Sequence, residues 1–150
     1  MNTITKKFLV VDAWVLGIAS GNPISNATWK ASEVLSRIIH VCHKVVLDLE
    51  EQSTDTILNE YDNQAKSEVT KRWIIALQTK PDKIVSRPRA NISLSALSDP
   101  DDLKYFQVAA NSPHRLIISE DSDMTSIADH PQVTSLRIEI WGLDDALSNL

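Results

Sequence analysis

Three short apolar segments that lead into acidic residues constrain the fold of this chain most strongly. The segments are residues 8–11, 44–47 and 116–118, and the acids that follow them are Asp12, Asp48 and Asp121. Continuous apolar runs of this length are typical of buried parallel strands, whereas half-exposed strands alternate apolar and polar residues. Ligands bind outside the carboxyl ends of such strands, so we expect these acids along one edge of a parallel sheet.

Apolar residues at helical spacing fill the intervals between these strands. They predict one helix over about residues 27–40 and another over about residues 67–79, which Pro81 ends. Asp48 and Glu51 have the spacing of a capping box and predict the start of a third helix. Strands that alternate with helices predict an α/β protein, a three-layer α/β/α domain with a mostly parallel central sheet.

The stretch from residue 84 to residue 98 has the weakest pattern. Residues 87–91 resemble a loop, and residues 92–97 alternate apolar and polar side chains as a strand does. Asp99 is placed as an N-cap and Pro100 as the first residue of a helix, with further acids in its first turn. The pattern therefore predicts a strand and then a helix before the apolar segment at 116–118.

The C-terminal part offers one more strand and one more helix. Residues 136–140 alternate cleanly and predict a half-exposed edge strand, and residues 142–147 predict a short helix. The chain contains no internal repeat, low-complexity tract or linker. We therefore expect a single domain over residues 1–150.

Composition and charge limit the classes of function. Charged residues make up 23% of the chain and its net charge is −5, which by itself argues against a nucleic-acid partner, because most nucleic-acid binders carry a basic surface. A carboxylate cluster repels phosphate without a metal ion but attracts it once a metal ion is bound. The single cysteine, the absence of a membrane-length apolar run and an N-terminus without a secretory pattern lead us to expect a cytoplasmic protein.

Four acids stand at element ends where they can converge. Asp12 and Asp121 follow strands, Asp102 lies in a first helical turn before the Asp121 strand, and Glu60 lies on the helix between the second and third strands. Oxygen ligands, mainly carboxylates, are those that Mg²⁺ and Mn²⁺ prefer. Such a site can activate water and stabilise the leaving oxygen of a phosphodiester.

The order of these acids resembles that of PIN-domain nucleases. Residues 8–12 are similar to the opening strand and aspartate of that family, and residues 57–61 to its helical glutamate segment. Residues 99–109 and 116–124 resemble its most recognisable stretch, in which an aspartate opens a helix and the next strand ends in Asp-x-Asp. The resemblance covers nearly the whole chain, although residues 67–98 match only in outline.

The resemblance implies a Mg²⁺- or Mn²⁺-dependent endoribonuclease, often the toxin of a toxin–antitoxin pair. Asp12, Asp102 and Asp121 would hold the metal ion, Glu60 would be a ligand or orient a water, and Asp123 would be a supporting acid. The implied partners are an RNA substrate and an antitoxin protein. We also expect a homo-oligomer, a dimer, and no membrane partner.

One departure from the family leaves other functions open. Many members have a small polar residue two positions after the first aspartate, where this chain has Trp14. Loss of a polar partner for Asp12 favours a catalytically impaired module that binds RNA or protein without cutting. A phosphatase or phosphoacceptor domain with Asp12 as nucleophile ranks last, because the phosphatase version normally needs an aspartate at the position of Trp14. Six basic residues form a group with two open interpretations, a surface that contacts phosphate beside the acidic site or an ordinary solvated surface. They are Lys71, Arg72, Lys80, Lys83, Arg87 and Arg89.

Overall fold

A five-stranded parallel sheet forms the centre of the structure. The computed structural model describes residues 5–21, 24–49 and 54–150. The strands within these ranges are β1 (Phe8–Val11), β2 (Lys44–Asp48), β3 (Ile84–Arg87), β4 (Leu116–Ile118) and β5 (Glu139–Trp141). They lie in the order β3-β2-β1-β4-β5, and every neighbouring pair is parallel. The predicted parallel sheet is confirmed.

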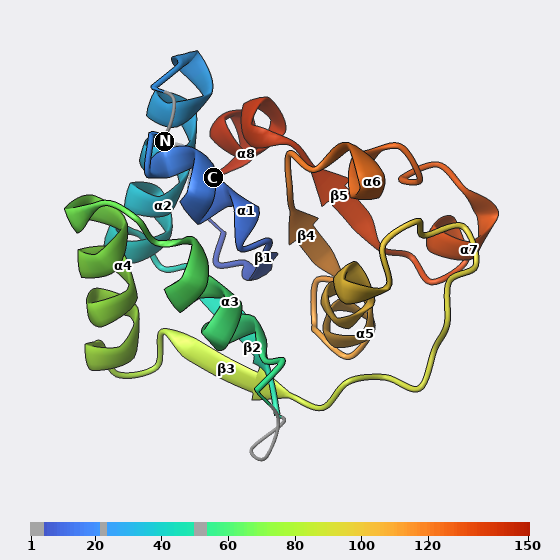
Figure 1. Cartoon of the computed structure of the whole chain (residues 1–150). Helices are drawn as coiled ribbons and strands as arrows, with labels where there is room; N and C mark the ends of the chain where they lie inside the picture. The colour runs from blue at the N-terminus through green and yellow to red at the C-terminus, as the bar shows by residue number, and fades with distance from the viewer. Residues whose placement is uncertain (1–4, 22–23, 50–53) are drawn as a thin grey trace.

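Helices cover both faces of this sheet. They are α1 (Trp14–Ala19), α2 (Asn26–His40), α3 (Ile57–Gln64), α4 (Glu68–Thr79), the 3₁₀ turn η1 (Pro100–Asp102), α5 (Leu103–Ala110), α6 (Ser122–Thr125), α7 (Pro131–Thr134) and α8 (Leu143–Asn149). Figure 1 shows α5 on one side of the sheet and α2, α4 and α8 on the other, which is the predicted three-layer α/β/α arrangement. Within the described ranges, none of these helices combines the length and apolar character that crossing a bilayer requires.

The apolar strand segments lie in the core, as their continuous hydrophobic character predicts. Leu9, Val10 and Val11 of β1 are fully buried, and so are Ile117 and Ile118 of β4. Because helices pack on both faces of these strands, neither face needs polar residues. The central strands are therefore fixed firmly enough to position whatever follows their carboxyl ends.

The chain begins the sheet at β1, adds strands on one side of it, and then continues on the other side. From β1 the sheet extends through β2 to β3 on one side, and through β4 to β5 on the other. Val11 pairs with Ile118, so the carboxyl ends of β1 and β4 lie level with each other. In open α/β sheets a switch of this kind creates a crevice where ligands bind.

The predicted capping box at Asp48 is wrong. Asp48 is the last residue of β2 and pairs with Arg87 of β3, and Glu51 lies outside the described residues. The helix begins later, at Ile57, with Thr56 as its N-cap. Asp48 still contacts this helix, because its Oδ1 accepts a hydrogen bond from the Ile57 amide over 3.0 Å.

The strand predicted at residues 92–97 does not form, and β3 at Ile84–Arg87 takes the place in the sheet. Leu94 is buried while Ser93 and Ser95 are exposed, but residues 95–96 form a turn, which the Leu97 amide closes on the Leu94 carbonyl oxygen over 3.2 Å. The alternation therefore belongs to a loop that lies on the core and not to a strand. The last strand begins at Glu139, three residues later than predicted, and lies at the sheet edge as expected.

Candidate functional site

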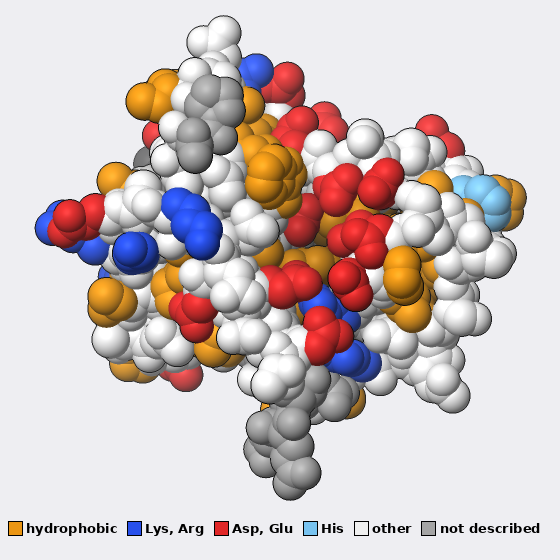
Figure 2. Space-filling model, viewed as in Figure 1, with side chains coloured by type: hydrophobic (Ala, Val, Ile, Leu, Met, Phe, Trp, Pro, Cys, Tyr) orange, Lys and Arg blue, Asp and Glu red, His pale blue; other side chains and the backbone are white. Residues whose placement is uncertain are grey.

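One pocket at the carboxyl ends of β1 and β4 gathers four of the five acids singled out from the sequence. Asp12, Glu60, Asp102 and Asp121 all line it. Its volume is about 320 Å³, which lies within the roughly 300–1,000 Å³ range of small-ligand sites. Figure 2 shows acidic side chains crowded around a hollow on this face of the molecule, bordered by hydrophobic side chains.

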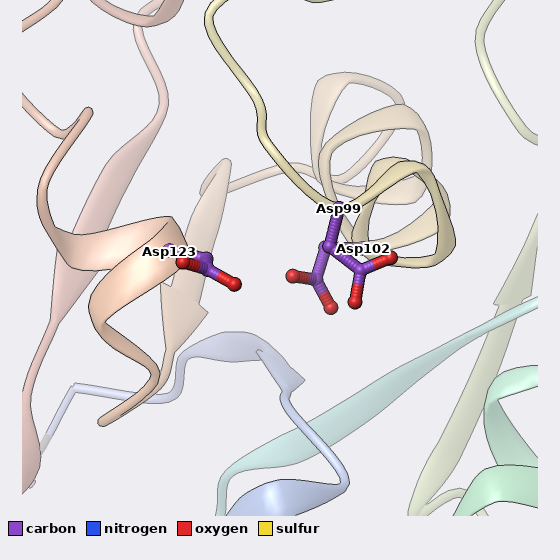
Figure 3. A group of neighbouring side chains, drawn as sticks. All are labelled: Asp99, Asp102 and Asp123. Atoms are coloured by element: carbon purple, nitrogen blue, oxygen red, sulfur yellow. The ribbon is translucent and has the colours of Figure 1, made fainter.

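The fifth acid, Asp123, does not line this pocket but lies near Asp102. One carboxylate oxygen from each of Asp99, Asp102 and Asp123 lies within 4.8 Å of the others. Figure 3 shows the side chains of Asp99 and Asp102, from the turn before α5, facing Asp123 of α6. Asp99, which the sequence placed only as an N-cap, is therefore a further candidate ligand. Asp99 is also the N-cap of η1, since its side chain accepts a hydrogen bond from the Asp101 amide.

Asp12 is buried and held at both carboxylate oxygens. The Ser119 hydroxyl donates to Oδ2 over 2.8 Å, and the Trp14 amide donates to Oδ1 over 3.2 Å. Burial raises the pKa of Asp12 to about 6, although these two hydrogen bonds oppose the rise, and the charges of Asp121 and Glu60 add to it. The carboxylate therefore titrates in a range where a cation would easily displace its proton.

Ser119 is a functional candidate that sequence reasoning missed. It follows β4 directly and is fully buried, and its hydroxyl oxygen also accepts a hydrogen bond from the Asp121 amide over 3.0 Å. One side chain thus links the acid after β1 to the acid after β4. A serine placed immediately after an apolar strand was the only sequence signal for it.

Glu60 is held by two buried side chains of α5. Its Oε1 lies 2.7 Å from Nζ of Lys104, and its Oε2 accepts a hydrogen bond from the Tyr105 hydroxyl. The Lys104 side chain is only 2% exposed and also pairs with Asp55 at 2.6 Å. Burial lowers the pKa of Lys104, but its hydrogen bonds to Asp55 and Glu60 outweigh this effect and raise the pKa overall. Glu60 is therefore a positioned carboxylate beside the other acids.

Asp102 has the features of a cation ligand. It is buried, and its Oδ2 has no hydrogen-bond partner among the described residues. Burial, and then the negative charges of Asp12 and Asp121, raise the pKa of Asp102 to about 7. A buried oxygen without a partner is costly, and a divalent cation would satisfy it. The all-oxygen ligand set therefore fits Mg²⁺ or Mn²⁺.

Part of the basic group defined from the sequence is occupied by contacts within the fold. Arg72 pairs with Glu68 on α4 at 2.7 Å, and Arg89 pairs with Asp48 at 2.6 Å. Nζ of Lys83 donates to three carbonyl oxygens, those of Ile38, Val41 and His43. Contacts of this kind occupy Lys83 and Arg89, whereas the Arg72–Glu68 pair is exposed on the surface of α4, so a phosphate flank built from the whole group is not supported.

Comparison of the chain with models of known protein families, with curated proteins and with solved structures gives no match. The chemistry of the pocket is therefore inferred from its own carboxylates, their burial and the groups that hold them.

Proposed function

We propose that this protein is a metal-dependent endoribonuclease that hydrolyses RNA phosphodiester bonds with Mg²⁺ or Mn²⁺. The observation that carries the proposal is the convergence of Asp12, Glu60, Asp102 and Asp121 on one pocket at the switch in strand order. Carboxylates brought together at such a crevice, with one buried oxygen left without a partner, form a set that a divalent cation would stabilise.

The cation would be held by Asp12, Asp102 and Asp121, which line the pocket together. Of these three, only Asp102 belongs to a group of carboxylates whose oxygens already lie within 4.8 Å of one another, and its neighbours there are Asp99 and Asp123. Bound in the pocket, the cation would supply positive charge that attracts the phosphodiester and polarises its oxygens. In a pocket lined by so many acids, this charge is what makes an anionic substrate acceptable.

The side chains of the protein itself would position the reactants. Ser119 holds Asp12 and the backbone of Asp121 at a fixed separation. Lys104 and Tyr105 fix the Glu60 carboxylate, and each Glu60 oxygen keeps a further lone pair. Glu60 can therefore accept a hydrogen bond from a water and orient it for in-line attack on phosphorus.

The resemblance to PIN-domain nucleases extends the proposal to the biological setting. By that resemblance the protein would be the toxin of a toxin–antitoxin pair, acting on RNA in the cytoplasm as a dimer and restrained by an antitoxin protein. The presence of a small antitoxin gene beside its own gene would support this part of the proposal. Expression without that neighbour should then arrest growth, and arrest should require Asp121.

A second candidate function is an RNA- or protein-binding module that does not cut. The observation that favours it is Trp14, which lines the pocket where a small polar residue would support Asp12. Ser119 weakens this alternative, because it supplies a hydroxyl to the same carboxylate from β4. A protein that binds RNA but never cleaves it with Mn²⁺ would establish the alternative.

The test is cleavage of a mixed RNA pool with Mn²⁺ and with EDTA by wild type, Asp12→Asn and Asp121→Asn. Asn at position 121 can still cap α6, whose N-cap is Asp121, so this variant should fold normally. Asp145→Asn, on the exposed first turn of α8, is the charge-matched control. We expect Mn²⁺-dependent cleavage by wild type and control and its loss in both site variants. Persistent cleavage by both site variants would refute the proposal.

A further inference from the structure

Trp14 is an exposed indole at the edge of the acidic pocket. Its side chain is 49% exposed although it lines the same pocket as Asp12 and Asp102. Its amide donates to Oδ1 of Asp12 over 3.2 Å, so the residue is anchored beside the site. An exposed aromatic side chain among carboxylates is poorly explained by packing alone, and it offers a flat apolar surface next to the reacting centre.

The indole ring of Trp14 packs in a defined position against Gly17 and does not project freely from the surface. A Cβ atom built on Gly17 would lie 2.8 Å from Cε3 and 3.0 Å from Cζ3 of Trp14. It would also lie 2.7 Å from Oε1 of Gln64, which lines the pocket as well. The missing side chain of Gly17 therefore leaves the space in which the six-membered ring of the indole rests against α1.

Trp14 also differs from the other exposed tryptophan of the chain. Trp29 on α2 is 65% exposed but does not line the pocket. Trp14 therefore differs from Trp29 in two features other than exposure, which are its contact with the acidic pocket and its packing against Gly17. A planar ligand group that stacks on this indole would lie beside Asp12.

We propose that Trp14 is a stacking platform for an unpaired nucleobase next to the phosphate in the acidic pocket. The proposal rests on the proposed nuclease function. Bases stack on tryptophan through their π-faces with little sequence preference. A base inside a duplex already stacks on its neighbours and must be unstacked before it can reach an indole. Trp14 thus selects for unpaired strands.

The test compares kcat and KM for a short unpaired RNA and for the same RNA annealed to its complement. The variants are Trp14→Ala, Trp14→Phe and Gly17→Ala, with Trp29→Ala as the matched control. We expect Trp14→Ala to raise KM for the unpaired RNA about tenfold, the loss that corresponds to one stacked base. Trp14→Phe should recover most of the loss, and Trp29→Ala should behave as wild type.

Gly17→Ala tests whether the packing of the Trp14 indole against Gly17 contributes to RNA binding. Alanine is favoured over glycine in a helix, so the helix itself should not be weakened. The added Cβ should displace the indole and, like Trp14→Ala, raise KM for the unpaired RNA. Wild type should have a lower KM for the unpaired RNA than for the annealed RNA. This difference should be smaller in Trp14→Ala and in Gly17→Ala.

An unchanged KM and an unchanged preference for unpaired RNA in Trp14→Ala would overturn the proposal. If Asp121→Asn still abolishes cleavage in that case, the nuclease function stands and only the stacking platform fails. If wild type cleaves no RNA, fluorescence anisotropy of the labelled unpaired RNA with Mn²⁺ decides the matter, and equal binding by wild type and Trp14→Ala overturns the platform. A change in oligomeric state of Trp14→Ala without any change in RNA binding or cleavage would assign the indole to a protein interface and also overturn it.

Discussion

The Ser119 hydroxyl donates a hydrogen bond to Oδ2 of Asp12 over 2.8 Å and accepts one from the Asp121 amide over 3.0 Å. Ser119 follows β4 and Asp12 follows β1, so the contact spans the two strands on either side of the crevice. Partners of this kind orient metal-ligating carboxylates. The hydroxyl also opposes the rise in the pKa of Asp12 that burial causes.

Ser119→Ala should therefore weaken Mn²⁺ binding by about tenfold, at the lower end of the effects seen when a partner of a metal ligand is removed. The fold should survive, because alanine fills most of the same space. Titration calorimetry at pH 7.5 measures the change. Ser126→Ala, at an exposed position after α6, is the control and should bind Mn²⁺ as wild type does. Equal affinities in the two variants would show that Ser119 does not support the site.

The stability of the metal-free protein should fall as pH rises from about 4 to about 7. Burial raises the pKa of Asp12 from 3.8 to about 6 and that of Asp102 to about 7, so the folded state holds these protons where the unfolded chain has lost them. Stability from a raised carboxyl pKa is fully present below pH 4 and disappears once pH exceeds the folded pKa. For Asp12 alone the change is on the order of 2–3 kcal/mol.

Thermal unfolding in EDTA at pH 5.0 and 7.5 measures this effect. Wild type should lose more stability between the two pH values than Asp12→Asn or Asp102→Asn, because an amide cannot titrate. Adding Mn²⁺ should raise Tm more at pH 7.5 than at pH 5.0, since ligands must be deprotonated to bind metal. A pH profile that is the same in all three proteins would contradict the assignment of these two carboxyls.

Lys104→Met should destabilise the protein by about 2 kcal/mol, because it leaves the Glu60 carboxylate without its buried cation. The Lys104 side chain is 2% exposed and pairs with both Asp55 and Glu60. Lys30→Met is the matched control, because the half-buried Lys30 pairs at a similar distance of 2.7 Å with Asp144, whose side chain is exposed. Its loss should cost less than about 1 kcal/mol. Urea unfolding compares the two, and equal losses would show that Lys104 acts as a surface lysine.

The sheet was predictable where the sequence signal is local. β1, β2 and β4 are continuous apolar runs that end near acids, and their burial on both faces requires that composition. The third strand was missed because Ser86 and Arg87 interrupt its apolar character at the edge of the sheet. Residues 92–97 show the converse, since apolar and polar residues also alternate in a loop that turns on the surface of the core.

The residues of the site also divide into those with a local sequence signal and those without one. Four acids at element ends were identified from the sequence, because the carboxyl ends of parallel strands meet at one edge. Ser119, Lys104 and Tyr105 were not identified, because their contacts with Asp12 and Glu60 join residues 44 to 107 positions apart. Asp99 was assigned a complete local role as an N-cap, which hid its approach to Asp102 and Asp123.

Titration of Mn²⁺ into wild type, Asp102→Asn, Asp99→Asn and Asp145→Asn at pH 7.5 tests the central claim most directly. Asparagine keeps the N-cap at position 99 and removes only its charge, so lost binding there cannot be attributed to a broken helix start. We expect wild type and Asp145→Asn to bind Mn²⁺ equally, and both variants of the acidic site to bind at least about tenfold more weakly. No binding to wild type, or equal binding by Asp102→Asn and wild type, would contradict a metal site in this pocket.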